Sequence, residues 1–209
     1  MRDGLPVRRP RSIALAVCLL TVPFLLVTAG APTGASATTG ASARAAVRDA
    51  TGVYIGTVTL RQTGRHTVQV SLKASRLSVG FHGFHIHAVG ICDPKTTDPA
   101  GNPAPFLSAG PHFDLAGSGH GNHAGDLPAL LVSRGGTASV TVESDRFTVT
   151  SLLDRDGSAI IIHASPDNLA NIPTRYVSTT TGAPGPDAAT LGTGDAGART
   201  ACGVVSRSS

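Results

Sequence analysis

The chain has 209 residues and a formal net charge of +4, and only 14% of its residues are charged. The first 37 positions hold four arginines and one aspartate; removing them from totals of 17 basic and 13 acidic residues leaves 13 and 12, which excludes a basic nucleic-acid-binding surface. This length suits one domain of ordinary size with some additional chain.

Residues 1–37 have the three parts of a secretory signal peptide. A start with four arginines is followed by an apolar run over residues 13–27 and then by small residues, including GASA at 34–37. The apolar run is shorter than the ~20 residues of a spanning helix and is interrupted by Pro23, which favours a cleaved signal over an uncleaved anchor. We therefore expect an exported protein, secreted, periplasmic or in the cell envelope, without a stable membrane span in its mature form.

Residues 38–50 consist largely of small residues with little to bury, so we expect a flexible leader there and a single domain over residues 51–209. In that domain short runs alternate apolar and polar residues and are enriched in β-branched side chains, as strands are. No stretch has a convincing helical period. The pattern predicts an all-β sandwich or barrel, with strands at 53–60, 67–74, 81–87, 137–143, 146–153, 159–164 and 201–205.

Two gaps between these strands, at about 88–128 and 165–198, are too long for simple turns and are rich in Gly and Pro. Loops of this length in a compact domain are usually functional or disordered, and we expect two long functional loops. Cys92 lies in the first loop and Cys202 follows the second, whereas Cys18 falls in the signal peptide. Two remaining cysteines in an exported chain predict one disulfide that pins the loops together.

Three histidines lie close together in the stretch FHGFHIH, residues 81–87. Residues two apart in a strand point to the same face, so His85 and His87 project together, ~6.5–7 Å apart, within reach of one metal ion. Phe84 and Ile86 face the core, and His82 is out of phase with the other two histidines.

Further candidate ligands lie in the rest of the chain: His112, His120, His123 and Asp126 in the first loop, and His163 at the end of the most apolar strand. Imidazole suits copper and zinc, and carboxylate with imidazole suits zinc. The sequence has no HExxH motif, no CxxC motif and no methionine beyond Met1, which argues against a zincin protease, a thiolate site and a blue-copper carrier. These residues predict a histidine-rich copper or zinc site on a β scaffold.

Several motifs, in order along residues 51–205, resemble the copper,zinc superoxide dismutases. They are GFHGFHIH (80–87), GPHFD (110–114), HAGDLP (123–128) and GDAGARTACGVV (194–205), and IIIHASPDNLANIPTRY resembles the secreted bacterial branch. The resemblance implies a flattened eight-stranded Greek-key β-barrel, with the missing eighth strand near residues 127–133. It also implies an enzyme that disproportionates superoxide to dioxygen and hydrogen peroxide, as a monomer or homodimer.

The resemblance assigns a role to each candidate residue. His112 would be a bridging ligand shared by both metals, and Arg199 would attract the anionic substrate beside the copper. Asp167 would hydrogen-bond ligands of both metals, and His82 would brace the barrel. The implied copper ligands are His85, His87, His112 and His163; the implied zinc ligands are His112, His120, His123 and Asp126; the implied disulfide is Cys92–Cys202.

Two features depart from the usual pattern of the family. Only Gly121 and Asn122 separate His120 from His123, where relatives have a longer spacer, so a copper site without a complete zinc site is an alternative. The loop over 165–198 carries few charges, so that superoxide steering would rest on Arg199 and the metals.

A second functional class is a non-enzymatic, secreted copper-binding or sequestering protein on the same fold. The chain keeps all four implied copper ligands and Arg199, which favours the enzyme. A copper-delivery protein is disfavoured because the chain lacks a CxxC donor site. A purely structural β domain would leave the positions of Asp167 and Arg199 unexplained.

Overall fold

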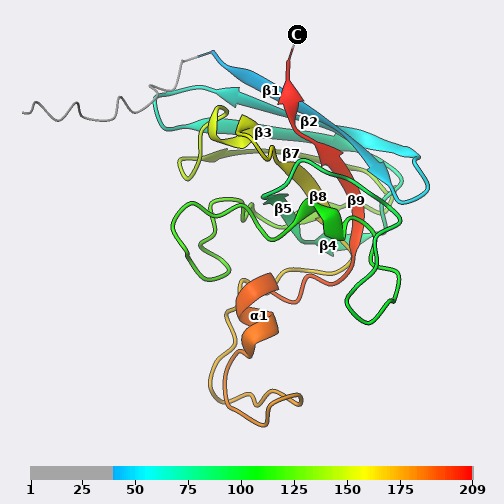
Figure 1. Ribbon diagram of the computed structural model, residues 1–209, viewed down its shortest axis with the longest axis vertical. Helices are drawn as coiled ribbons and strands as arrows, with labels where there is room; N and C mark the ends of the chain where they lie inside the picture. The colour runs from blue at the N-terminus through cyan, green and yellow to red at the C-terminus, as the bar shows by residue number, and fades with distance from the viewer. Residues whose placement is uncertain (1–39, 209) are drawn as a thin grey trace, which may run out of the picture. The chain divides into compact units, whose positions relative to one another are not determined.

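The computed structural model describes residues 40–208 (Figure 1), so the predicted signal peptide at 1–37 lies outside the described part. Over residues 40–208, the helices are too short and not apolar enough for any of them to cross a membrane. The strands are β1 (Ser42–Asp49), β2 (Tyr54–Gln62), β3 (Val68–Ala74), β4 (Gly80–His82), β5 (Phe84–His87), β6 (Leu130–Val132), β7 (Ala138–Ser144), β8 (Ala159–His163), β9 (Arg199–Val204) and β10 (Ser206–Arg207).

The strands form two antiparallel sheets. The larger sheet has the order β5-β8-β9-β1-β2-β3-β7, with β10 paired to β1, and the smaller sheet consists of β4 and β6. Figure 1 shows β1, β2, β3 and β7 side by side as the long strands of the larger sheet. Neighbours that are distant in sequence, such as β9 and β1, give a Greek-key arrangement, which confirms the predicted all-β fold.

Alternating burial explains why the long strands form. In β3, Val68, Val70 and Leu72 are fully buried, while the residues between them are only partly buried. The β2 strand places Val58 and Leu60 on the same side of the larger sheet, opposite Leu72 and Val70 in register. These apolar pairs build one continuous core, as expected for strands with one buried face.

The predicted flexible leader at 38–50 is wrong for most of its length, because residues 42–49 form β1 between β2 and β9. Ala43, Ala45 and Val47 are completely buried, and the alternating residues Arg44 and Arg48 are exposed. Most buried side chains of β1 are small alanines, so composition hid a clear period-two pattern.

The strand expected over 146–153 is absent. The β7 strand ends at Ser144, and the described chain continues through turns to a short 3-10 helix, η2 (Ser151–Leu153). Thr148 N–H donates to Ser151 Oγ, and Ser151 Oγ donates back to Thr148 O. Such local side-chain bonds to the backbone compete with pairing in a sheet, although Phe147, Val149 and Leu152 still reach the core.

Several other elements refine the sequence prediction. The run at 81–87 divides at Gly83 into β4 and β5, and β6 confirms the strand expected near 127–133. The second long loop, expected to lack helix, contains α1 (Ala188–Thr193), and the first contains the 3-10 helix η1 (Leu107–Ala109). The α1 helix begins where Asp187 accepts a hydrogen bond from Thr190 N–H, a standard N-cap.

The predicted disulfide is present between Cys92 and Cys202, across a sequence separation of 110 residues. Cys202 lies in β9, so the bond ties the first long loop to the larger sheet and not to the second loop. A cross-link that closes a loop of this length stabilises a fold by about 4–5 kcal/mol in the chain-entropy account. The disulfide therefore anchors the first loop close to Arg199, at the start of β9.

Candidate metal centre

The β5 strand divides its side chains between the core and the candidate site. Phe84 and Ile86 belong to the hydrophobic core, and His85 and His87 point to the opposite face, where they are fully buried. The partner strand β8 pairs Ile162 with Phe84, and His163 N–H donates to Gly83 O at 2.9 Å. This register places the His163 ring beside His85, with ring centroids 4.8 Å apart.

Backbone hydrogen bonds join the free edge of β5 to the first long loop. Phe113 N–H donates to Ile86 O at 2.8 Å, which holds His112 next to His87. Ile86 N–H donates to Gly125 O at 2.9 Å, which holds Asp126 next to His85. Since β5 ends the larger sheet, its unpaired backbone groups are available to organise this loop.

Two clusters result, and His112 belongs to both of them. In the first cluster, one ligand atom from each of four histidines lies within 4.8 Å of the others. The second cluster meets the same limit with three histidines and one carboxylate. The first cluster contains His85, His87, His112 and His163; the second contains His112, His120, His123 and Asp126.

The second cluster forms although only two residues separate its loop histidines. Gly121 turns the chain with φ +87°, a conformation that glycine adopts readily. Asp126 Oδ2 accepts hydrogen bonds from Gly121 N–H at 2.7 Å and His123 N–H at 3.0 Å, which closes the turn. The rings of His120 and His123 then lie with centroids 5.6 Å apart, so the short spacer brings both rings to the cluster.

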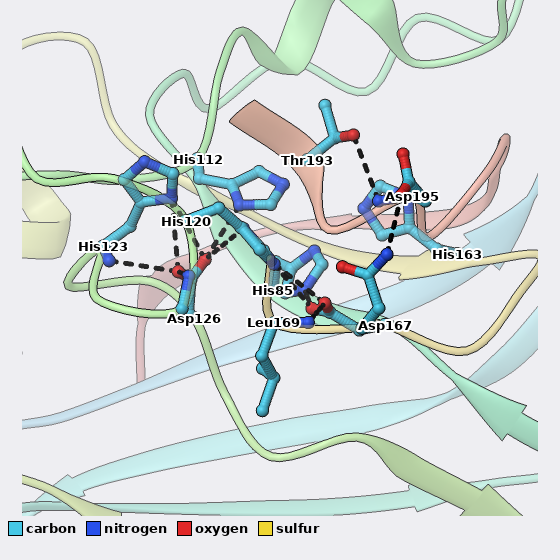
Figure 2. A network of polar contacts seen from close by, with 12 residues as sticks. His85, His112, His120, His123, Asp126, His163, Asp167, Leu169, Thr193 and Asp195 are labelled. Atoms are coloured by element: carbon cyan, nitrogen blue, oxygen red, sulfur yellow. Dashed lines mark hydrogen bonds and ion pairs between the residues drawn. The ribbon is translucent and has the colours of Figure 1, made fainter. Parts of the chain in front are cut away.

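Asp167 connects the two clusters (Figure 2). Its carboxylate lies 2.6 Å from His85 Nε2 and 2.8 Å from His120 Nε2, and it also accepts from Leu169 N–H at 2.7 Å. Figure 2 shows His120 between Asp126 and Asp167. Carboxylates that hold histidine rings in this way fix the orientation of the ring and the atom that can bind a metal.

The rings direct their remaining nitrogens into the clusters. His87 Nδ1 donates to Gly110 O at 2.9 Å and His163 Nδ1 to Gly197 O at 3.0 Å, while their Nε2 atoms lie 3.4 Å apart. His85 Nδ1 and His120 Nδ1 are buried and have no hydrogen-bond partner within residues 40–208. Unpaired buried ring nitrogens are costly in a folded protein, and a metal ion would satisfy them.

Burial keeps several of these rings neutral. It lowers the pKa of His163 to about 3 and that of His87 well below its usual value, the latter helped by the nearby charge of Arg199. Burial also lowers the pKa of His112, although Asp126 opposes it. Neutral rings need not release a proton before they bind a metal, so the site is prepared to accept one at neutral pH.

Both carboxylates are held in their charged form. Burial alone would raise the pKa of Asp126, but the hydrogen bond from His112 and the neighbouring rings lower it to about 2. Burial likewise acts to raise the pKa of Asp167, and the hydrogen bonds from His85 and Leu169 outweigh it and lower this pKa. Two negative charges thus lie beside the rings, which favours a cation in their midst.

Arg199 lies at the mouth of the first cluster. Its guanidinium donates to Phe106 O and Gly110 O, both at 2.7 Å, so two carbonyls of the first loop fix its direction. An open pocket of about 470 Å³ is lined by Arg199, Asp195 and the rings of His87, His112 and His163. This pocket connects the first cluster to solvent and presents a positive charge to an entering anion.

The structure brings together every candidate site residue of the sequence analysis, and His82 takes the bracing role. His82 Nδ1 donates to His163 O at 2.7 Å, and Nε2 lies 2.8 Å from Ser78 O. Sequence analysis missed Asn168 and Asp195, which hydrogen-bond to each other beside Asp167. Both lie within motifs that resemble the family, PDN and GDAG, and that was the only signal available for them.

Comparisons with known proteins agree with this architecture. Residues 54–205 match the copper/zinc superoxide dismutase family. The chain is 40% identical over 193 residues to the Cu-Zn superoxide dismutase of Mycolicibacterium paratuberculosis. This match covers 88% of this chain and 85% of the relative. It is 45% identical over 150 residues to that of Mycobacterium tuberculosis, over 71% of this chain and 59% of the relative.

Solved structures show the same fold. A SOD-like protein from Bacillus subtilis is similar with a TM-score of 0.55 and 25% identity, over 77% of this chain and 96% of that one. The clock protein EA4 is similar with a TM-score of 0.60 and 25% identity, over 80% of this chain and 95% of that one. Given its motifs, its sheet order and these matches, the chain belongs to the copper/zinc superoxide dismutase family, and its reaction is the disproportionation of superoxide.

Proposed function

We propose that the first cluster binds copper, that the second binds zinc, and that superoxide reacts at the first. The observation that carries this proposal is the place of His112, which takes part in both clusters with its Nδ1 2.8 Å from Asp126 Oδ1. Four imidazoles suit copper, and three imidazoles with one carboxylate suit zinc. The proposed copper ligands are His85, His87, His112 and His163, and the proposed zinc ligands are His112, His120, His123 and Asp126.

The donor atoms fit these two ions. The unpaired Nδ1 atoms of His85 and His120 belong to different clusters, and Asp167 holds both rings by their Nε2 atoms. Each cluster thus has one buried nitrogen that gains a partner when a metal binds. Asp126 adds a negative charge to the second cluster only, as expected where the ion keeps a fixed charge of +2.

Bound copper would supply the redox chemistry, taking one electron from a first superoxide, which leaves as dioxygen, and giving it to a second, which leaves as hydrogen peroxide with two protons. The protein supplies access, charge and a place for a proton. The Arg199 guanidinium draws superoxide into the pocket, and its planar fork suits a small anion. His112 Nε2 is the ring nitrogen that can hold a proton on the side of the first cluster, because Nδ1 is engaged by Asp126.

We further propose that the protein acts outside the cytoplasm. The Cys92–Cys202 bond is typical of an oxidising compartment, and the first 37 residues have the sequence of a secretory signal. Superoxide crosses membranes poorly, so an exported enzyme meets it where it is made. The balanced charge after residue 37 gives no support to a nucleic-acid partner.

Metal analysis combined with a superoxide-scavenging assay on the purified protein tests the proposal. We expect one copper and one zinc per chain, and scavenging activity that is lost on copper removal and restored by copper but not by zinc. Copper bound without activity would favour the secreted copper-binding protein instead. Activity without bound zinc would leave the copper site standing and contradict the zinc site.

A further inference from the structure

The C-terminal end of α1 lies directly against the carboxylate that joins the two clusters. The helix ends at Gly194, which has φ 60° and donates its N–H to Thr190 O. A side chain at Gly194 would overlap Asp167 Oδ1 and His120 Nε2, so the backbone itself packs on their hydrogen bond. A glycine is needed here for close approach as well as for conformation.

The next residue, Asp195, is tied to the segment that carries Asp167. Its Oδ2 accepts a hydrogen bond from Asn168 Nδ2 at 2.6 Å and another from Thr190 Oγ1 at 2.9 Å. Asn168 N–H donates to Gly194 O and Ser165 N–H to Ala196 O, both at 2.9 Å, so backbone bonds also join these neighbouring segments. Figure 2 shows Asp195 beside Asp167, on the side away from Asp126.

The backbone of Asp195 adopts a conformation that is energetically unfavourable for a residue other than glycine. Its φ is 52°, in the left-handed region that aspartate visits uncommonly. Such a conformation persists where surrounding contacts stabilise it. Here those contacts are the hydrogen bonds to Asn168 and Thr190, because the side chain is otherwise exposed.

We propose that Asp195 is a positioning residue for both clusters, acting through Asn168 to hold Asp167 against His85 and His120. The property of Asp195 that matters is the hydrogen bond that its carboxylate accepts from Asn168, and not its negative charge. That bond holds Asn168 in place and with it the backbone of its neighbour, Asp167. The inference rests on the proposed metal sites. It adds Asp195, in the second long loop, to the residues that orient the metal ligands. Loss of a group that bonds a metal ligand directly, as Asp167 does, typically weakens metal binding 10- to 100-fold, so the lower end of this range is expected for Asp195.

Four variants of the full-length protein test the proposal. Asp195→Gly removes the acceptor and tolerates the positive φ, whereas Asp195→Asn keeps an acceptor in a residue that also adopts this conformation. Asn168→Asp removes the donor and places two carboxylates next to each other. Combining it with Asp195→Asn restores the hydrogen bond in the opposite direction, with residue 195 as donor and residue 168 as acceptor. The matched control is Asp98→Gly, because Asp98 likewise orders a loop through an asparagine, Asn102, in the disulfide-bonded loop.

The readouts are zinc affinity by chelator competition and the visible spectrum after cobalt replaces zinc. We expect Asp195→Gly and Asn168→Asp to weaken zinc binding about tenfold and to shift the cobalt bands. Asp195→Asn, the double variant and Asp98→Gly should match the wild type. If Asp195→Gly does not fold, the comparison of Asn168→Asp with the double variant decides the question.

Three outcomes would overturn the proposal. Zinc affinity of Asp195→Gly or Asn168→Asp equal to that of the wild type would show that Asp167 needs no such support. Equal losses in Asp195→Asn and Asp195→Gly would make charge, not the acceptor, the relevant property. A wild-type protein that binds neither zinc nor cobalt would overturn the proposed zinc site itself, and this inference with it.

Discussion

The two clusters share one ring but are built in different ways. Three histidines of the first cluster lie on paired strands, His85 and His87 on β5 and His163 at the end of β8. All four residues of the second cluster lie in one loop, which is held by backbone bonds to the edge of β5 and by the side-chain hydrogen bonds of Asp126. Sheet register therefore fixes most of the first cluster, while the second depends on how this loop is held.

The largest expected effect comes from removing a strand ligand. His163→Ala opens the first cluster, and we expect superoxide-scavenging activity to fall more than about 100-fold, beyond the loss typical of an outer contact. Zinc content should stay close to that of the wild type, because the second cluster does not include this ring. His66→Ala is the control, since His66 is exposed. Loss of both metals together would show that the clusters are not built independently.

Acid should destabilise the metal-free protein through the buried strand histidines. The unfolded chain binds a proton at His163 near pH 6.5, and the folded ring does so only near pH 3. Stability is therefore complete above pH 6.5 and falls as the pH drops toward 3, by about 3 kcal/mol at pH 4 from this ring. Urea unfolding at pH 7, 5.5 and 4 measures it. A His163→Ala protein with the same pH dependence as the wild type would contradict this origin.

Removing a loop ligand should affect stability more than reaction. With zinc at 100 times its Kd, binding contributes about 2.7 kcal/mol, which corresponds to roughly 5–10 °C in Tm for a chain of this size. We expect the His120→Ala protein to lose zinc and, with it, this increase in Tm. It should retain most of its copper-dependent activity. Calorimetry and metal analysis provide the measurement. Unchanged zinc content would show that this loop holds no zinc.

The smallest effect concerns the pocket mouth, which serves the first cluster alone. Asp195 and Arg199 line the same pocket, so the Asp195 carboxylate opposes the entry of an anion that Arg199 attracts. Asp195→Asn should raise kcat/KM about twofold at low ionic strength, since a unit charge about 10 Å away in water is worth about 0.4 kcal/mol. The gain should disappear at high salt, where charges are screened. A gain that is independent of salt would point to a change in geometry instead.

Prediction from the sequence succeeded where residue type and spacing within a short motif identify a candidate ligand. The pair His85 and His87, the ring at the end of β8 and the acidic residue after His123 were each recognisable from spacing and residue type. It failed for β1, whose small alanines resembled a linker, and for residues 146–153, where Ser and Thr side chains replace strand pairing. The small side chains of β1 masked its period-two alternation, and local hydrogen bonds between Thr148 and Ser151 overrode the alternation at residues 146–153.

From the order of its residues alone, the chain predicted an all-β domain, a secretory signal peptide, one disulfide and a set of imidazoles with two carboxylates beside them. The tertiary structure placed His112 in both clusters, as the family resemblance implied, and it alone decided that two residues of spacer are enough for His120 and His123 to meet. The same holds for the link from Asp195 through Asn168 to Asp167. These contacts depend on sheet register and on hydrogen bonds between segments that are far apart in the sequence, and the local pattern of residues determines neither.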